Sequence, residues 1–252
     1  MKLIVLGSGV CVPSAKRGSP VYYIEFDEEC FLIDGGSGTI RSLVKAGIDY
    51  SLLDGVFYTH MHPDHTADLV PLLFALKNDP SIRRESDISL YGPTGFIDFF
   101  GKLKDVFGDW FIPENFEIYV EELNDGDEII KRSVRINAKR VFHTDNSLGY
   151  RFISRDDKTI VFSGDSGYCK ELVELANSAD LAVFECSFPE EYNISGHLNP
   201  GSAGKLAQQA GVKTLVLSHI YPVTENYPIL DRCREFFDGD VFIADDLSTF
   251  KI

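Results

Sequence analysis

The sequence has few basic residues, few cysteines and no long apolar stretch. Lys and Arg number 24 against 39 Asp and Glu, so the 252-residue chain carries a formal net charge of −15. This balance disfavours binding to a long polyanion, because nucleic-acid-binding proteins usually carry a basic patch and no dense cluster of Lys and Arg occurs here. No stretch approaches the length of a membrane span, so no membrane partner is expected. A local basic or metal-centred site could still bind a small anionic substrate.

The five cysteines are scattered through the chain, odd in number, and include no C-x-x-C pair. This pattern is typical of reduced thiols, so we expect a cytoplasmic protein without a disulfide framework. The N-terminal apolar run stops at Gly7, which is too early for a signal peptide and indicates a first strand. Neither a linker nor a composition shift divides the chain. We therefore predict a single domain over residues 1–252, long enough to bury a sizeable core.

Short apolar runs alternate with segments of helical periodicity in both halves of the chain. The helix signal is strong at 200–210, where Asn199 can cap, Pro200 takes the first helical position and Gly211 follows the end. The predicted helices span residues 39–46, 66–78, 96–107, 167–178 and 200–210. The predicted strands span residues 3–6, 21–26, 30–33, 52–58, 88–91, 117–120, 128–130, 134–142, 149–153, 159–162, 181–185, 214–218 and 241–243. Two packed sheets with helices outside them would bury every apolar stripe.

Four potential metal ligands (His60, His62, Asp64 and His65) lie within six residues. His60 and His62 are two positions apart in an extended or turning segment, so both side chains can reach one point. Asp64 and His65 lie at a helix entrance and must point elsewhere, so the motif offers two half-sites. A single His here would be most simply a hydrogen-bonded loop or core residue. Three His and one Asp at this spacing instead favour zinc or a similar divalent ion.

Three further candidate ligands follow apolar strands, at the positions from which α/β proteins usually build their sites. His143 and His219 could alternatively be hydrogen-bonded strand-end residues, and Asp165 a turn or helix-cap residue. Their shared position, and the need for more ligands than the first motif provides, favour ligation. Three protein ligands with an open position are typical of a catalytic metal site. Two such sites sharing Asp165 would hold a hydroxide between them as a nucleophile at neutral pH.

The motif H-x-H-x-D-H, followed by a distant His, an Asp and a final His, resembles the metallo-β-lactamase superfamily over the whole chain. The resemblance implies an α/β fold, a four-layer αββα sandwich of two mixed β-sheets with helices on both outer faces. It also implies two divalent metal ions bridged by Asp165. The implied ligands are His60, His62 and His143 for one metal, and Asp64, His65 and His219 for the other.

The metal itself is not specified by these ligands. Zinc is favoured, and manganese or iron also suits His and Asp ligands. The flavin-linked di-iron oxygen reductases of this superfamily carry Glu where His62 stands, which disfavours a redox di-iron site. Asp34 resembles the family's aspartate that orients the His motif from outside the ligand set, although it could be a plain turn Asp before two glycines.

Within the superfamily the chain is most similar to the ribonuclease Z branch. The shared features are Leu6-Gly7-Ser8-Gly9 with Pro13 and Arg17, Asp34-Gly35-Gly36, Tyr91-Gly92-Pro93, and Glu185 followed by Gly196-His197-Leu198. His197 resembles that branch's extra histidine, which would protonate the leaving oxygen, and Glu185 resembles its orienting partner. Alternatively, His197 is a structural loop residue before the predicted helix cap. The expected catalytic residues are Asp64, His197 and Glu185.

Two departures from that branch limit what the resemblance implies for this chain. Family members insert a long tRNA-gripping arm between the third His and the bridging Asp, but here only 22 positions separate His143 from Asp165. Pro63 also replaces the family's glycine before the motif Asp, which could stiffen the loop. Together with the net charge of −15, the missing arm disfavours folded tRNA as a partner.

The predicted function is a binuclear metal-dependent hydrolase that cleaves a small or short phosphodiester. The alternatives are a ribonuclease Z-like tRNA 3′-end endonuclease, or lactonase, esterase or arylsulfatase chemistry in the same site. A non-catalytic metal-dependent sensor is a further alternative, but degenerate relatives would be expected to lose ligands, and this set is complete. Because relatives often pair, a homodimer is also compatible with the resemblance.

Overall fold

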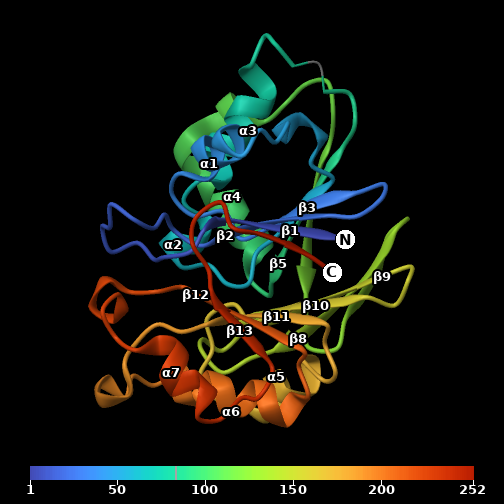
Figure 1. Ribbon diagram of the computed structural model, residues 1–252. Helices are drawn as coiled ribbons and strands as arrows, with labels where there is room; N and C mark the ends of the chain where they lie inside the picture. Colours follow the sequence, from blue (N-terminus) through green and yellow to red (C-terminus); the bar gives the residue numbers. More distant parts are fainter. Residues whose placement is uncertain (83) are drawn as a thin grey trace.

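The computed structural model describes residues 1–82 and 84–252, which form two β-sheets packed face to face between layers of helices (Figure 1). The first sheet has the order β14-β1-β2-β3-β4-β5-β6. Its strands are β1 (Lys2–Gly7), β2 (Val21–Glu25), β3 (Cys30–Ile33), β4 (Gly55–Phe57), β5 (Ile88–Pro93), β6 (Ile118–Leu123) and β14 (Thr249–Lys251). Strands β14 to β3 pair antiparallel, whereas β3 to β6 pair parallel, so the sheet is mixed.

The second sheet has the order β13-β12-β11-β10-β9-β8-β7 and is also mixed. Its strands are β7 (Glu128–Ile130), β8 (Val134–Arg140), β9 (Leu148–Ser154), β10 (Thr159–Phe162), β11 (Leu181–Glu185), β12 (Thr214–Ser218) and β13 (Asp240–Ile243). Strands β7 to β10 pair antiparallel and β10 to β13 pair parallel. The parallel strands bring several carboxyl ends to one edge, where side chains from distant parts of the chain can meet.

Helices cover the outer face of each sheet (Figure 1). Those over the first sheet are α1 (Thr39–Lys45), α3 (Leu69–Asn78) and α4 (Phe96–Phe107). Those over the second sheet are α5 (Lys170–Leu175), α6 (Pro200–Ala210) and α7 (Ile229–Arg234). The single turn α2 (Pro63–Thr66) and the short 3₁₀ turns η1 (Tyr50–Leu52), η2 (Gly108–Phe111), η3 (Glu190–Tyr192) and η4 (Pro222–Thr224) lie in connections. The predicted four-layer αββα sandwich is therefore confirmed.

Successive side chains along each strand point to opposite faces of the sheet, and this alternation gives three apolar layers. In β4, Phe57 points between the sheets, where its ring stacks on that of Tyr91 with the ring centroids 4.5 Å apart. Its neighbour Val56 points to the other face of the sheet and packs against the helices. In β10, Phe162 and Val161 divide in the same way between the inner and outer layers. Because both faces of these central strands are buried, they read as continuous apolar runs, as expected for covered parallel sheets.

Several predicted boundaries were wrong. The helix predicted at 66–78 is interrupted, because Asp68 leaves the helical path and its carboxylate accepts hydrogen bonds from the Gly38 and Ile40 amides. Pro71 lies in the first turn of α3, where a proline is tolerated. The helix predicted at 167–178 is longer than the observed helix α5, which spans Lys170–Leu175. The short elements α7 and β14 were not predicted.

The chain between His143 and Asp165 is filled by β9 and β10, which pair antiparallel from Thr159↔Ile153 to Phe162↔Tyr150. No arm extends from this part of the structure, in agreement with the spacing in the sequence. Among the described residues, no helix is both long and apolar enough to cross a bilayer.

Candidate metal centre

The candidate ligands meet at the edge where several strands end. His60 lies three residues after β4, His143 three after β8, Asp165 three after β10, and His219 directly after β12. His62 precedes α2, whose first residue is Pro63, so the proline begins the turn that carries Asp64 and His65. The predicted strand-end positions are therefore confirmed, and seven side chains from four separate segments of the chain come together.

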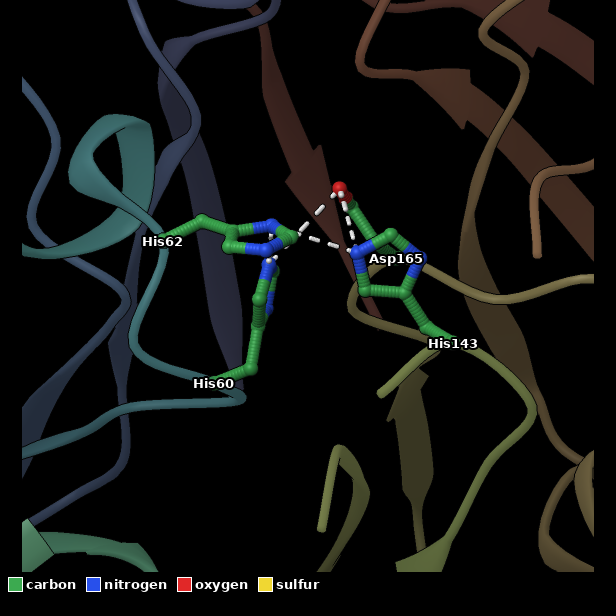
Figure 2. A group of neighbouring side chains, drawn as sticks. All are labelled: His60, His62, His143 and Asp165. Carbon is green, nitrogen blue, oxygen red and sulfur yellow. Dashed lines mark hydrogen bonds and ion pairs between the residues drawn. The ribbon is translucent and has the colours of Figure 1, made fainter. Parts of the chain in front are cut away.

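Three histidines and one oxygen of Asp165 make up the first half-site (His60, His62 and His143), which Figure 2 shows converging from separate segments. His62 Nδ1 lies 2.9 Å from His60 Nε2 and 3.2 Å from His143 Nε2. Asp165 Oδ2 lies 3.8 Å from the Nε2 atoms of both His60 and His143. Ligands about 2.0–2.1 Å from a tetrahedral zinc are roughly 3.3 Å apart, so these four atoms fit one ion.

In the second half-site (Asp64, His65 and His219), both histidines face the other oxygen of Asp165. Asp165 Oδ1 lies 3.3 Å from His65 Nε2 and 3.2 Å from His219 Nε2. Asp64 Oδ2 lies 3.5 Å from His219 Nε2. These spacings also suit ligands around one divalent ion, so Asp165 stands between two such positions with one oxygen toward each.

The second half-site contains buried polar atoms that lack partners. His65 Nε2, His219 Nε2 and Asp165 Oδ1 have no hydrogen-bond partner among the described residues, although each is buried. Buried polar groups are otherwise almost always satisfied, because leaving one unpaired costs free energy. A divalent cation would satisfy all three atoms at once, so the donor set fits a metal ion.

The protonation states of the first-half-site ligands also suit a cation. Burial lowers the pKa of His60 well below its usual value, and the neighbouring His65 adds to this, so His60 is neutral. Burial would raise the pKa of Asp165, but the charges of His219 and His65 outweigh it and hold that pKa well below its usual range. Neutral imidazole and ionised carboxylate are the forms that bind metals.

His65 behaves differently. Burial would lower its pKa, but the carboxylates of Asp165 and Asp34 outweigh burial and raise that pKa well above its usual value. A cation must therefore displace a proton from His65, so the affinity of the second half-site for metal should increase with pH.

Asp34 holds both the motif backbone and His65. Its Oδ2 accepts a hydrogen bond of 2.8 Å from His65 Nδ1, and its Oδ1 accepts one of 2.8 Å from the Thr59 amide. The first bond places the imidazole proton on Nδ1 and leaves Nε2 free to face Asp165. Asp34 has a φ of 60° and His219 a φ of 57°, left-handed conformations that non-glycine residues seldom adopt and that concentrate at functional sites.

Ser187 was missed by sequence reasoning, yet it links the second half-site to the predicted catalytic pair. Its Oγ lies 2.9 Å from His219 Nδ1 and donates a hydrogen bond of 2.5 Å to Glu185 Oε2. Serine is too common in loops to stand out, and the only signal was its place two residues after Glu185 at a strand end.

His197 lies at the outer side of the second half-site. Its Nδ1 donates a hydrogen bond of 2.7 Å to Glu185 Oε1, which also accepts one of 2.9 Å from the Ser166 amide. Burial would lower the pKa of His197, but the bond to Glu185 and that residue's charge outweigh it and raise the pKa. One ligand atom of His197 lies within 4.8 Å of those of Asp165 and His219. The predicted pairing of Glu185 with His197 is therefore present.

Comparisons with known proteins agree with this geometry. A family model described as a β-lactamase superfamily domain matches residues 31–220, which is most of the chain. The chain belongs to the β-lactamase superfamily. It is a metal-dependent hydrolase of that superfamily, and the predicted family and enzyme class are confirmed.

Individual relatives extend the match over nearly the whole chain. A ribonuclease Z of Ignicoccus hospitalis is 30% identical, covering 100% of this chain and 98% of its own. The metallo-β-lactamase fold protein YhfI of Bacillus subtilis superimposes with a TM-score of 0.82 at 25% identity, covering 99% of this chain and 98% of its own. The short form of human tRNase Z superimposes with a TM-score of 0.81 at 24% identity, covering 100% of this chain and 99% of its own. The likeness to ribonuclease Z read from the sequence is thus confirmed.

Proposed function

We propose that this hydrolase cleaves a small or short phosphodiester with two divalent ions, zinc being favoured. The observation that carries the proposal is the pair of half-sites sharing Asp165, with His197 beside them. His60, His62, His143 and Asp165 would hold one ion, and Asp64, His65, His219 and Asp165 the other. Such ions supply Lewis-acid charge for a phosphoryl oxygen and a water nucleophile that ionises near neutral pH.

The residues of the chain position and move protons around this centre. Asp34 and Ser187 fix the rings of His65 and His219 through their Nδ1 atoms, so the Nε2 atoms stay directed at Asp165. Glu185 holds His197 by its Nδ1, which leaves Nε2 as the proton donor for the leaving oxygen. An alkoxide is a poor leaving group, so a proton donor favours phosphodiester cleavage over reactions with better leaving groups. The name ribonuclease Z on relatives supports the same bond type.

A substrate screen tests the proposal. Purified protein reconstituted with zinc or manganese should hydrolyse aryl or cyclic phosphodiesters, and His62→Ala should lose turnover together with the ion of the first half-site. Opening of lactones, or hydrolysis of thioesters or sulfate esters, without phosphodiester turnover would overturn the phosphodiester assignment. Full turnover by the His62→Ala protein would overturn the role of the metals.

The second candidate is tRNA 3′-end cleavage, which the 30% identity to a ribonuclease Z favours. The missing arm and the net charge of −15 disfavour it. Incubation with a precursor tRNA at low and high salt decides between the two. We expect no specific cut at either salt concentration, whereas cleavage at the 3′ end would replace the first proposal with this one.

A further inference from the structure

We propose that Phe188, Tyr221 and Tyr192 form a stacking subsite for a planar aromatic group, of nucleobase size, carried by the substrate. This inference rests on the proposed phosphodiesterase function, because it places the aromatic group on an ester arm next to the metal centre. The three residues are called the aromatic wall below.

Topology brings the aromatic wall to the metal centre. Phe188 follows β11 and Tyr221 follows β12, two parallel strands paired up to Glu185↔Ser218. The wall therefore lies at the same sheet edge as His219. Ligands of open α/β sheets bind beyond the carboxyl ends of such strands.

The rings form a continuous surface from the proposed proton donor to a proposed ligand. The Phe188 ring centroid lies 5.6 Å from that of His197, with an interplanar angle of 78°, and 4.3 Å from that of Tyr221, at 30°. Tyr221 in turn lies 5.9 Å from His219. Tyr192 extends the surface outward, at 6.0 Å and 26° from Phe188. A substrate group beside the leaving oxygen would therefore meet aromatic faces.

The wall is open to solvent, unlike the aromatic residues between the sheets. Phe188 and Tyr221 are half-buried and Tyr192 is 47% exposed, whereas Phe57 and Phe152 are fully buried. Apolar side chains left open beside a polar centre are typical of ligand-binding surfaces. Nucleobases stack on such rings because every base has a π-face.

Hydrogen bonds to the backbone of Ser187 hold the loop that carries Phe188. The Ser187 amide donates to Leu198 O at 3.1 Å, and Thr224 Oγ1 donates to Ser187 O at 2.7 Å.

The Tyr221 hydroxyl makes no hydrogen bond to any residue that the structure describes, whereas the buried Tyr22 hydroxyl donates to Ser218 Oγ at 2.9 Å. The phenol of Tyr221 is thus available to a ligand.

Binding of a matched ligand pair tests the subsite without requiring turnover. Adenosine 5′-monophosphate and ribose 5-phosphate share the sugar and the phosphate, and only the first carries a base. Titration calorimetry on the metal-loaded protein should show adenosine 5′-monophosphate binding about tenfold tighter or more, the effect of one stacked base. Equal dissociation constants would overturn the proposal.

Variants locate the effect on the wall. Phe188→Leu and Tyr221→Leu should remove most of the preference, and Tyr221→Phe, which keeps the ring, should retain it. Phe107→Leu is the matched control, because Phe107 is 47% exposed on α4 over the other sheet. If Phe188→Leu does not fold, the exposed Tyr192→Leu gives the same test with a smaller loss. A preference that survives both the Phe188→Leu and Tyr192→Leu changes would overturn the proposal.

A second pair separates a nucleobase from a simpler ring. Benzyl phosphate and cyclohexylmethyl phosphate have equal charge and similar size. A preference for benzyl phosphate supports the wall as a site for any planar group, and a preference confined to the adenosine ligand supports a nucleobase. If the adenosine preference is present but no phosphodiester is hydrolysed, the proposed function fails and the subsite stands. If phosphodiesters are hydrolysed without any aromatic preference, the subsite alone fails.

Discussion

The two half-sites share Asp165 but differ in how the protein supports them. In the first, His62 is exposed and its ring nitrogen lies within 3.2 Å of the other two histidine ligands, so these atoms partly satisfy one another. In the second, both histidines are buried, and their Nε2 atoms have no partner among the described residues.

The difference bears on affinity. Asp34 and Ser187 hold both histidines of the second half-site before any ion binds. In the first half-site His60 and His143 are held at Nδ1 as well, but the exposed His62 must be ordered when an ion binds. An ion in the second half-site also relieves the cost of three unpaired buried atoms. We therefore expect the second half-site to bind its ion more tightly than the first.

The largest effect should come from removing the shared ligand. Asp165→Ala takes one oxygen from each half-site, so the bound metal should fall from two ions per chain toward none. Loss of a residue that only hydrogen-bonds a ligand costs up to about 100-fold in activity. Asp165 is itself a proposed ligand, so phosphodiester turnover should fall by more than this. Elemental analysis and activity assays check this, with circular dichroism to confirm folding. Retention of two ions would contradict the sharing of Asp165.

A smaller effect separates the half-sites. His62→Ala should lose one ion and keep the second, whereas His65→Ala should lose the ion that wild-type protein retains longest against a chelator. In wild-type protein, a chelator titration followed by elemental analysis should remove metal in two steps. A single step in wild-type protein, or loss of both ions in each variant, would show that the half-sites are not distinct in affinity.

The next largest effect should come from Asp34, which holds the ring of His65. Asp34→Asn keeps a side chain that tolerates the left-handed backbone but removes the carboxylate charge, and should weaken metal binding at the second half-site by about 10- to 100-fold. Asp157→Asn is the matched control, an exposed aspartate with a φ of 58°. Competition with a fluorescent chelator measures both. Equal affinity in the two variants would make Asp34 a plain turn residue.

The smallest effect should come from Ser187. Ser187→Ala removes the hydrogen bonds of the Ser187 hydroxyl with His219 and Glu185. Of these, only the bond to His219 touches a proposed metal ligand, and a neutral bond is worth about 0.5–1.5 kcal/mol, so metal affinity should fall by roughly 2- to 10-fold. Exposed Ser14→Ala provides the control. The same competition assay applies, and a loss as large as that of Asp34→Asn would mean that Ser187 contributes more to metal binding than its bond to His219 accounts for.

Much of the site was predictable, because its ligands lie at strand ends that apolar runs make visible. His143, Asp165 and His219 each follow such a run, and the spacing of the motif that begins at His60 is enough to indicate two half-sites. The interruption of the helix near Asp68 was not predictable, since it depends on hydrogen bonds to Gly38 and Ile40, about thirty positions away.

Other features are set by tertiary packing that a local pattern does not reveal. Strand β14 is three residues at a sheet edge, and its pairing with β1 joins the two ends of the chain. Ser187 and the aromatic wall depend on the neighbouring carboxyl ends of β11 and β12. The residues concerned are common types in loops, and only the fold brings them to the metal centre.

Stepwise reconstitution of metal-free protein tests the central claim most directly. Zinc or manganese is added in fractions of an equivalent, and hydrolysis of a phosphodiester is measured at each point. With two half-sites of unequal affinity sharing Asp165, the first equivalent should bind with little turnover, and activity should rise as the second equivalent binds. Full activity after one equivalent, or turnover without any added metal, would contradict the account.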